Sequence, residues 1–145
     1  DQGQATPAMR ALAELARSEG LTVIGWRQVP TDDSMIGATA KACKPDFWQL
    51  FITDYVSTGI ELDRAVYGFR KLAEHDLGVY FSSLSSRTFL YKGMLTTGQL
   101  SPFFPDLTDP LVHSTLALVH SRFPPTHFLR GHLRTRIGLL PITVR

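Results

Sequence analysis

The chain has 145 residues, with 15 Lys and Arg against 13 Asp and Glu, a formal net charge of +2 and a sequence pI near 8.9. This length fits one domain, and 43% hydrophobic with 19% charged residues excludes a wholly disordered chain. No apolar run approaches the ~20 residues of a membrane-spanning helix, and no signal-peptide pattern opens the chain. A single cysteine, Cys43, excludes an internal disulfide framework and a cysteine-based zinc cluster, and it fits a reducing compartment.

Positive charge is concentrated at the C-terminal end. Residues 1–123 have 11 Lys and Arg against 13 Asp and Glu, a net of −2. Residues 124–145 contain no acidic residue and carry a net of +4, from Arg130, Arg134, Arg136 and Arg145. Such asymmetry usually indicates a segment that binds nucleic acid or acidic lipid.

The first predicted elements are a helix and a strand. Thr6 supplies a capping hydroxyl and Pro7 a preset first helical residue, and Gly20 fits the helix end. Leu21–Arg27 is short and rich in β-forming residues, which predicts a strand. Within the predicted helix, between its cap and its end, apolar residues recur at helical spacing: Ala8, Met9, Leu12, Leu15 and Ala16.

The middle of the chain predicts a loop, a strand and the clearest helix. Thr31–Gly37 is polar and is expected to be a loop, whereas Gln49–Thr53 is expected to be a strand. A stripe at i, i+3, i+4 and i+7 then predicts an amphipathic helix. Its apolar members are Leu62, Ala65, Val66, Phe69, Leu72 and Ala73.

The last third predicts further strands around a loop. Val79–Leu84 and Thr88–Tyr91 are expected to be two strands or one interrupted strand. Gly98–Pro110 has three prolines and is expected to be a loop, and Thr115–Val119 a buried strand. Helices and strands alternate loosely, so the expected class is mixed α and β.

Single residues leave the chemistry open. Cys43 lies near Lys41 and Lys44, whose charge can lower the pKa of a thiol, but a lone cysteine is more often incidental. Arg122, at the end of an apolar strand, needs a carboxylate partner, which is either a structural ion pair or a ligand. Metal binding is disfavoured because the histidines lack suitable spacing or acidic companions: His113, His120, His127 and His132.

Several motifs occur in one order that resembles a known family, the N-terminal class II glutamine amidotransferase domain of the glutamate synthase large subunit. The resemblance covers nearly all of residues 8–123. It includes polar residues that no folding pattern dictates. The matching stretches are LTVIGWRQVP (21–30), LDRAVYGFRKLAE (62–74), YFSSLSSRTFLYKGML (80–95), FPDLTD (104–109) and LALVHSRF (116–123).

This resemblance implies an α+β fold that is part of the αββα four-layer sandwich of N-terminal nucleophile hydrolases. Such a domain hydrolyses glutamine to glutamate and ammonia, with an N-terminal cysteine as nucleophile and its own α-amino group as base. The ammonia then aminates 2-oxoglutarate in a synthase domain that uses FMN and an iron–sulfur cluster. The implied partners are the rest of the large subunit and, in bacteria, a small NADPH-oxidising subunit, in the cytoplasm or, for a plant-type enzyme, in the plastid.

Few site residues carry over from the family. Arg122 of the HSRF motif matches the arginine that holds the glutamine carboxylate, and His120 and Ser121 belong to the same motif as supporting residues. Cys43 does not match the family nucleophile, which opens the domain well upstream, so the chain is expected to be an internal fragment. No role is known for the matching residues Ser85, Ser86, Arg87, Lys92 and Gly93.

The tail departs from the family pattern and is interpreted as out of frame. After HSRF, residues 124–145 read PPTHFLRGHLRTRIGLLPITVR. A back-translation of this stretch, read from its third base, spells TNTFPSWPPSHPYRLIAHNGE, which is the expected family continuation. We therefore expect residues 1–123 to be domain sequence and residues 124–145 to follow the loss of one base.

The frame shift has a chemical consequence. The Asn-Gly of the family's HNGE segment supplies the oxyanion hole. In this chain the bases that would encode that segment in the shifted frame encode Pro141–Val144 instead. Without nucleophile and oxyanion hole, the chain alone is expected to be inactive. The alternatives are an inactive module that binds glutamine or another carboxylate through Arg122, and a nucleic-acid-binding protein with a basic C-terminal arm.

Overall fold

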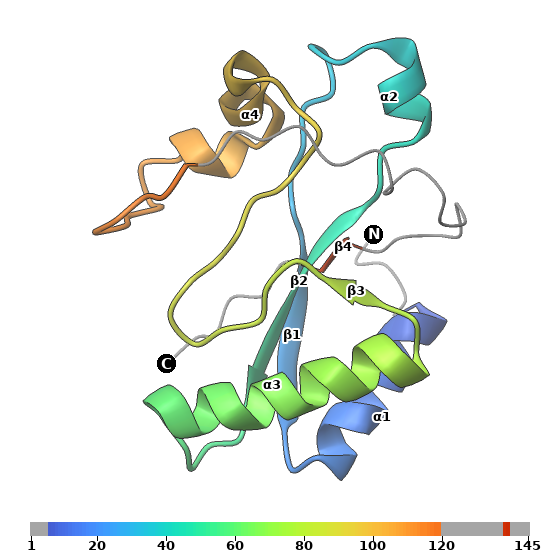
Figure 1. Ribbon diagram of the computed structural model, residues 1–145, viewed down its shortest axis with the longest axis vertical. Coiled ribbons are helices and arrows are strands. Elements are labelled where there is room, and N and C mark those ends of the chain that lie inside the picture. Colours follow the sequence, from blue (N-terminus) through green and yellow to red (C-terminus); the bar gives the residue numbers. More distant parts are fainter. Residues whose placement is uncertain (1–5, 120–137, 140–145) are drawn as a thin grey trace.

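The computed structural model describes residues 6–119 and 138–139 (Figure 1). Among these, no helix is long and apolar enough to cross a membrane. The elements in chain order are α1 (Pro7–Ser18), β1 (Thr22–Gln28), α2 (Ala38–Ala42), β2 (Phe47–Thr53), α3 (Gly59–Asp76), β3 (Tyr80–Phe81), α4 (Thr97–Phe103), the 3₁₀ helix η1 (Pro105–Thr108) and β4 (Gly138–Leu139).

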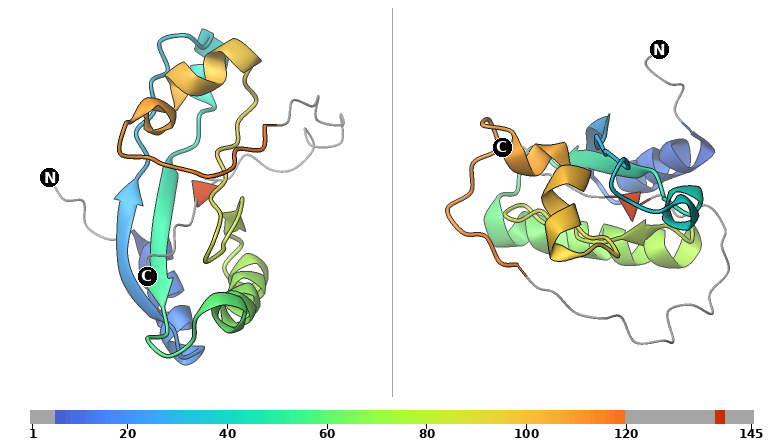
Figure 2. Two further views of the ribbon diagram at one scale, coloured as in Figure 1. Left: turned by 90° about the vertical axis from the view of Figure 1, so that its left-hand side faces the viewer. Right: turned by 90° about the horizontal axis from the view of Figure 1, so that it is seen from above.

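The strands form one mixed sheet in the order β1-β2-β4-β3. β1 and β2 pair antiparallel and place Arg27 opposite Gln49 and Trp26 opposite Leu50, while β4 runs parallel to both of its neighbours. Figures 1 and 2 show α1 and α3 at one end of the long β1–β2 pair and α2, α4 and η1 at the other. The expected mixture of helices and strands is therefore confirmed.

Two apolar clusters occupy these two ends. The larger packs α1 and α3 against the sheet, with Leu50, Ile52 and Phe81 buried from the strands. The smaller one is aromatic: Phe103 and Phe104 meet Phe47 edge-on, with ring centroids 6.2 and 5.4 Å away. The buried helical residues of the larger cluster are Leu12, Ala16, Leu62, Val66, Phe69 and Ala73.

The predicted helices over the first half are confirmed. The Thr6 hydroxyl accepts a hydrogen bond from the Met9 amide at 3.2 Å and caps α1, and Gly20 ends the turn in the left-handed region at φ +74°. In α3 the predicted stripe faces the core, except that Leu72 is 37% exposed.

The predicted strands of the first half are confirmed as well. β1 is one residue displaced from the predicted 21–27, and β2 begins two residues earlier than predicted. The predicted loop 31–37 contains no helix or strand. The short helix α2 follows it and was not predicted, because five residues give too little periodicity to recognise.

The predicted loop over Gly98–Pro110 is wrong, since this stretch holds most of α4 and all of η1. Thr96 and Gln99 form a capping box that starts α4. Pro105 stands in the first turn of η1, where its missing N–H costs nothing. Pro105 therefore sits where a short helix tolerates it, whereas Pro102 lies inside α4.

Two predicted strands are not formed in the described part of the chain. Of Val79–Leu84 only β3 is a strand, and Thr88–Tyr91 has no strand pairing. Thr115–Val119 is neither a strand nor buried, with Leu116 80% and Leu118 92% exposed. A strand requires a neighbour for its N–H and C=O groups, and local sequence does not specify one.

The packing of α3 yields the first prediction. Phe69→Ala removes a fully buried ring and leaves a cavity, so the free energy of unfolding should fall by about 3–5 kcal/mol. Urea denaturation measures this loss. Tyr67→Ala is the control, because Tyr67 lies on the same helix and is 60% exposed. Equal losses for both variants would contradict the assignment of Phe69 to the core.

Candidate functional site

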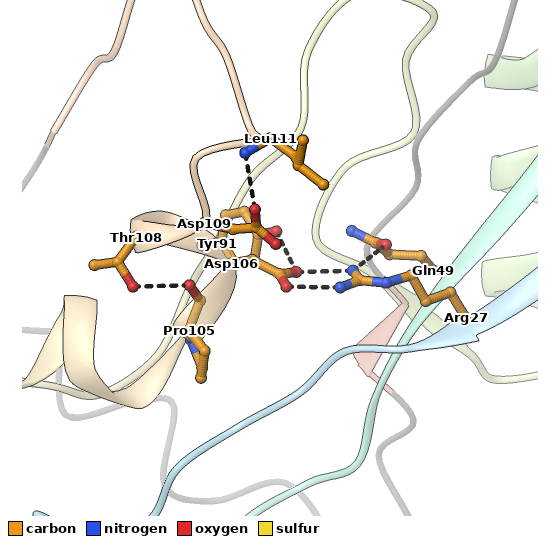
Figure 3. A network of polar contacts seen from close by, with 8 residues as sticks. All are labelled: Arg27, Gln49, Tyr91, Pro105, Asp106, Thr108, Asp109 and Leu111. Carbon is orange, nitrogen blue, oxygen red and sulfur yellow. Dashed lines mark hydrogen bonds and ion pairs between the residues drawn. The ribbon is translucent and has the colours of Figure 1, made fainter.

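A network of polar side chains at the far end of the sheet centres on Asp106 (Figure 3). Arg27 donates to both carboxylate oxygens, from Nη2 to Oδ1 at 2.6 Å and from Nη1 to Oδ2 at 2.7 Å. The Tyr91 hydroxyl donates to Oδ2 at 2.7 Å. This is the bidentate pairing, with two parallel N–H···O hydrogen bonds, that a guanidinium forms with a carboxylate.

Three parts of the fold bring the network together. Arg27 lies on β1 directly opposite Gln49 on β2, and Arg27 Nη1 also donates to Gln49 Oε1 at 2.8 Å. Asp106 arrives on η1, after the aromatic pair Phe103 and Phe104 anchors this segment in the smaller cluster. The Asp106 side chain is 5% exposed and that of Arg27 is 42% exposed, so only the carboxylate is removed from water.

The network fixes the ionisation of its members. The hydrogen bonds from Arg27 are the main reason that the pKa of Asp106 lies below its ordinary value, and the same contact raises the pKa of Arg27. Burial first, and then the hydrogen bond to Asp106, raises the pKa of Tyr91. At neutral pH the site therefore holds an ion pair and a neutral phenol that donates to it.

An open cleft of about 320 Å³ lies beside this network. No group of three or more His, Cys, Asp or Glu side chains within residues 6–119 and 138–139 could hold a metal ion. The cleft combines the polar network with apolar walls. Its lining residues are Arg27, Gln49, Phe51, Phe89, Tyr91, Asp106, Asp109, Leu111, Val112 and His113.

The predicted site residues stand apart from this cleft or outside the described chain. Arg122, His120 and Ser121 lie outside the described residues. Cys43 is exposed at the end of α2, and the two lysines beside it form ion pairs with one carboxylate, that of Asp33, at 3.3 and 3.5 Å.

The polar residues shared with the family hold local structure. The Ser86 amide donates to Asp63 Oδ1 at 2.7 Å, which ties the segment to α3. Lys92 Nζ donates to the Tyr80 hydroxyl at 3.0 Å and lies 5.5 Å from the centre of that ring, so it has a protein partner rather than an open anion cradle.

Sequence reasoning missed Arg27, Gln49 and Asp106 as members of one site. One signal was available, since Gln49 interrupts the apolar strand segment FWQLFIT with an amide. A buried amide requires partners, so such a residue points to a polar network. The pairing of Arg27 with Asp106, 79 residues away, has no local signature.

Comparison with known proteins gives consistent matches. The family model of class II glutamine amidotransferases matches residues 1–131. The ferredoxin-dependent glutamate synthase 2 of Arabidopsis thaliana is 37% identical over 87% of this chain and 8% of its own length. The glutamate synthase (NADPH) large chain of Bacillus subtilis is 40% identical over 79% of this chain and 8% of its own, and the glutamate synthase (NADH) of Saccharomyces cerevisiae 37% over 79% and 6%. The chain thus spans less than a tenth of the relatives it matches.

The network yields a second prediction. Asp106→Asn removes the charge that pairs with Arg27, so the free energy of unfolding should fall by about 2 kcal/mol. Glu61→Gln is the matched control, because the ion pair of Glu61 with Arg64 is exposed on both sides. Denaturation by urea measures both. A loss for Asp106→Asn no larger than that of the control would contradict a stabilising role.

The lowered pKa of Asp106 gives this loss a pH dependence. The unfolded carboxyl has its ordinary pKa near 3.8, so the stabilisation is complete above that pH and is lost as the pH falls through the lower folded pKa. The difference in unfolding free energy between the parent chain and Asp106→Asn should be constant from about pH 7 to 5 and shrink below about pH 4. A difference that grows on acidification would have the wrong sign.

Proposed function

The chain belongs to the class II glutamine amidotransferase family, and we propose that it forms part of the glutaminase domain of a glutamate synthase. One observation carries the proposal. Glutamate synthases whose names include ferredoxin, NADPH or NADH all match most of this chain at 33–40% identity. In such an enzyme the domain hydrolyses glutamine, and the ammonia aminates 2-oxoglutarate to give a second glutamate.

Within that reaction the proposed role of Arg122 is to hold the glutamine carboxylate. A guanidinium offers a rigid pair of donors, which orients the side-chain amide for attack. His120 and Ser121 belong to the same HSRF motif and are proposed to shape the turn that presents Arg122.

The iron–sulfur cluster of a glutamate synthase does not fit this chain. An iron–sulfur cluster requires several cysteine thiolates, and the sequence contains only Cys43. The cluster is therefore assigned to another part of such an enzyme, and FMN is proposed to bind there with it. The proposed partners are the remaining domains of the large subunit and, in bacteria, a small NADPH-oxidising subunit. The proposed compartment is the cytoplasm, or the plastid for a plant-type enzyme, in line with relatives named as chloroplastic.

The four-layer sandwich of the N-terminal nucleophile hydrolases is the proposed complete fold. The packing of α1 and α3 against a sheet supports one helical layer and one sheet layer of it. The second sheet and the second helical layer are not represented among the described elements.

We also propose that residues 124–145 are translated out of frame. The tail has four arginines and no acid, against a net of −2 before it, and a back-translation with chosen synonymous codons spells the family continuation in the shifted frame. Reading the source DNA is the direct test. A coding sequence that cannot give TNTFPSW in the alternative frame would refute the proposal.

Restoring the frame gives a test at the protein level. A gene with one base inserted before the codon of Pro124 should encode a protein that melts at a higher temperature than the present chain. We expect this because a sequence shaped by natural selection packs against its domain better than an out-of-frame sequence does. A chain truncated after Phe123 is the control for simply removing the tail. A restored chain no more stable than the truncated one would contradict the expectation.

The proposal predicts the activity of the isolated chain. The 145-residue protein should release no ammonia from glutamine, because its one cysteine is internal and the Asn-Gly oxyanion hole is missing. A coupled ammonia assay measures this, with the complete Bacillus subtilis relative as positive control. Release above the buffer blank would overturn the inactive assignment, and calorimetric binding of glutamine would favour a binding module.

A further inference from the structure

The cleft beside Asp106 contains a buried hydrogen-bond donor with no acceptor. Gln49 is 0% exposed, and its amide nitrogen Nε2 has no hydrogen-bond partner in the part of the chain that the structure describes. Leaving such a donor unsatisfied costs about 1–3 kcal/mol. An acceptor atom that reached Nε2 would recover this free energy.

The orientation of the Gln49 amide is set by its neighbour. Arg27 Nη1 is a donor only, and it lies 2.8 Å from the amide oxygen Oε1 (Figure 3). Turning the amide over would set two donors against each other. Nε2 therefore points away from the guanidinium with both of its N–H groups available, and Gln49 lines the cleft.

The charges around the cleft favour an uncharged acceptor. Arg27 and Asp106 neutralise each other at 2.6 Å, and the second carboxylate of the lining, Asp109, adds negative charge. The remaining titratable groups that face the cleft are the neutral phenol of Tyr91 and His113. A carboxylate ligand would thus meet no free cation except protonated His113, whereas a carbonyl oxygen needs none.

The walls define what carries that carbonyl group. Phe51, Phe89, Leu111 and Val112 contribute apolar surface on the other sides of the cleft. Leu111 is 85% exposed, and the Leu111 and Val112 amides donate only to Asp109 among the described residues. Gln49 Nε2 is buried in this arrangement, so an acceptor reaches it only when part of the cleft wall is displaced. A volume of about 320 Å³ suits a small ligand.

We propose that this cleft binds an uncharged amide group attached to an apolar substituent, with the amide oxygen accepting from Gln49 Nε2. The same chemistry occurs in a small acylated amide and in a peptide segment. The proposed contact involves neither Arg122 nor a cysteine, so it can be tested independently of the proposed hydrolysis of glutamine.

Side-chain amide signals in nuclear magnetic resonance spectra provide the test. N-acetyl-leucinamide is titrated into the ¹⁵N-labelled 145-residue chain, and the NH₂ signals of Gln49, assigned by their loss in Gln49→Glu, should shift with saturation. N-acetyl-leucine, which replaces the neutral amide end by a carboxylate, should bind about tenfold more weakly. A longer capped peptide that binds more tightly than N-acetyl-leucinamide would identify a peptide segment as the ligand. Equal affinity of the two would identify a small acylated amide.

Two variants separate the proposed contact from general effects. Gln49→Glu keeps an acceptor for Arg27 but removes both N–H donors. Leu111→Ala shortens an exposed side chain of the cleft wall without changing the polar network. Each variant should weaken binding of N-acetyl-leucinamide by about tenfold. Gln28→Glu changes an exposed amide outside the lining and should bind like the parent. Unshifted Gln49 signals, or equal affinity of the parent and the folded Leu111→Ala variant, would overturn the proposal.

Discussion

The pairing of Arg27 with Asp106 is the constraint that organises the far end of the molecule. It joins a strand near the start of the chain to a single 3₁₀ turn 79 residues later, through two hydrogen bonds of 2.6 and 2.7 Å. Tyr91 adds a third attachment from the segment between them. A carboxylate that is 5% exposed requires such partners to remain ionised, so Asp106 links these three segments to one another.

The two apolar clusters stabilise opposite ends of the β1–β2 pair. The larger, helical cluster buries side chains from α1, α3 and the sheet, and Arg70 of α3 also donates to the Phe81 carbonyl oxygen at 2.7 Å. The smaller, aromatic cluster contains only three buried residues, Val29, Phe103 and Phe104, and lies next to the ion pair. The long β1–β2 pair contributes residues to both clusters, Trp26 and Leu50 to the larger and Phe47 to the smaller, and so connects them.

Elements whose partners are close in sequence could be predicted, and those with distant partners could not. The cap at Thr6 and the stripe of α3 depend on residues three or four apart, so α1 and α3 were found with nearly correct bounds. Thr115–Val119 has the composition of a strand but pairs with no strand among the described residues, and its side chains are exposed. The network of Arg27, Gln49 and Asp106 was missed for the same reason, since charge complementarity across 79 residues leaves no spacing pattern.

The shortest strand shows how little a sheet demands of the chain that completes it. β4 contributes two residues, Gly138–Leu139, and these join β2 to β3, which otherwise share no pairing. Strand pairing uses main-chain N–H and C=O groups that every residue but proline provides, so this position selects for an extended backbone and hardly for side chains. The space between β2 and β3 therefore accepts an extended backbone segment through main-chain pairing on both of its sides.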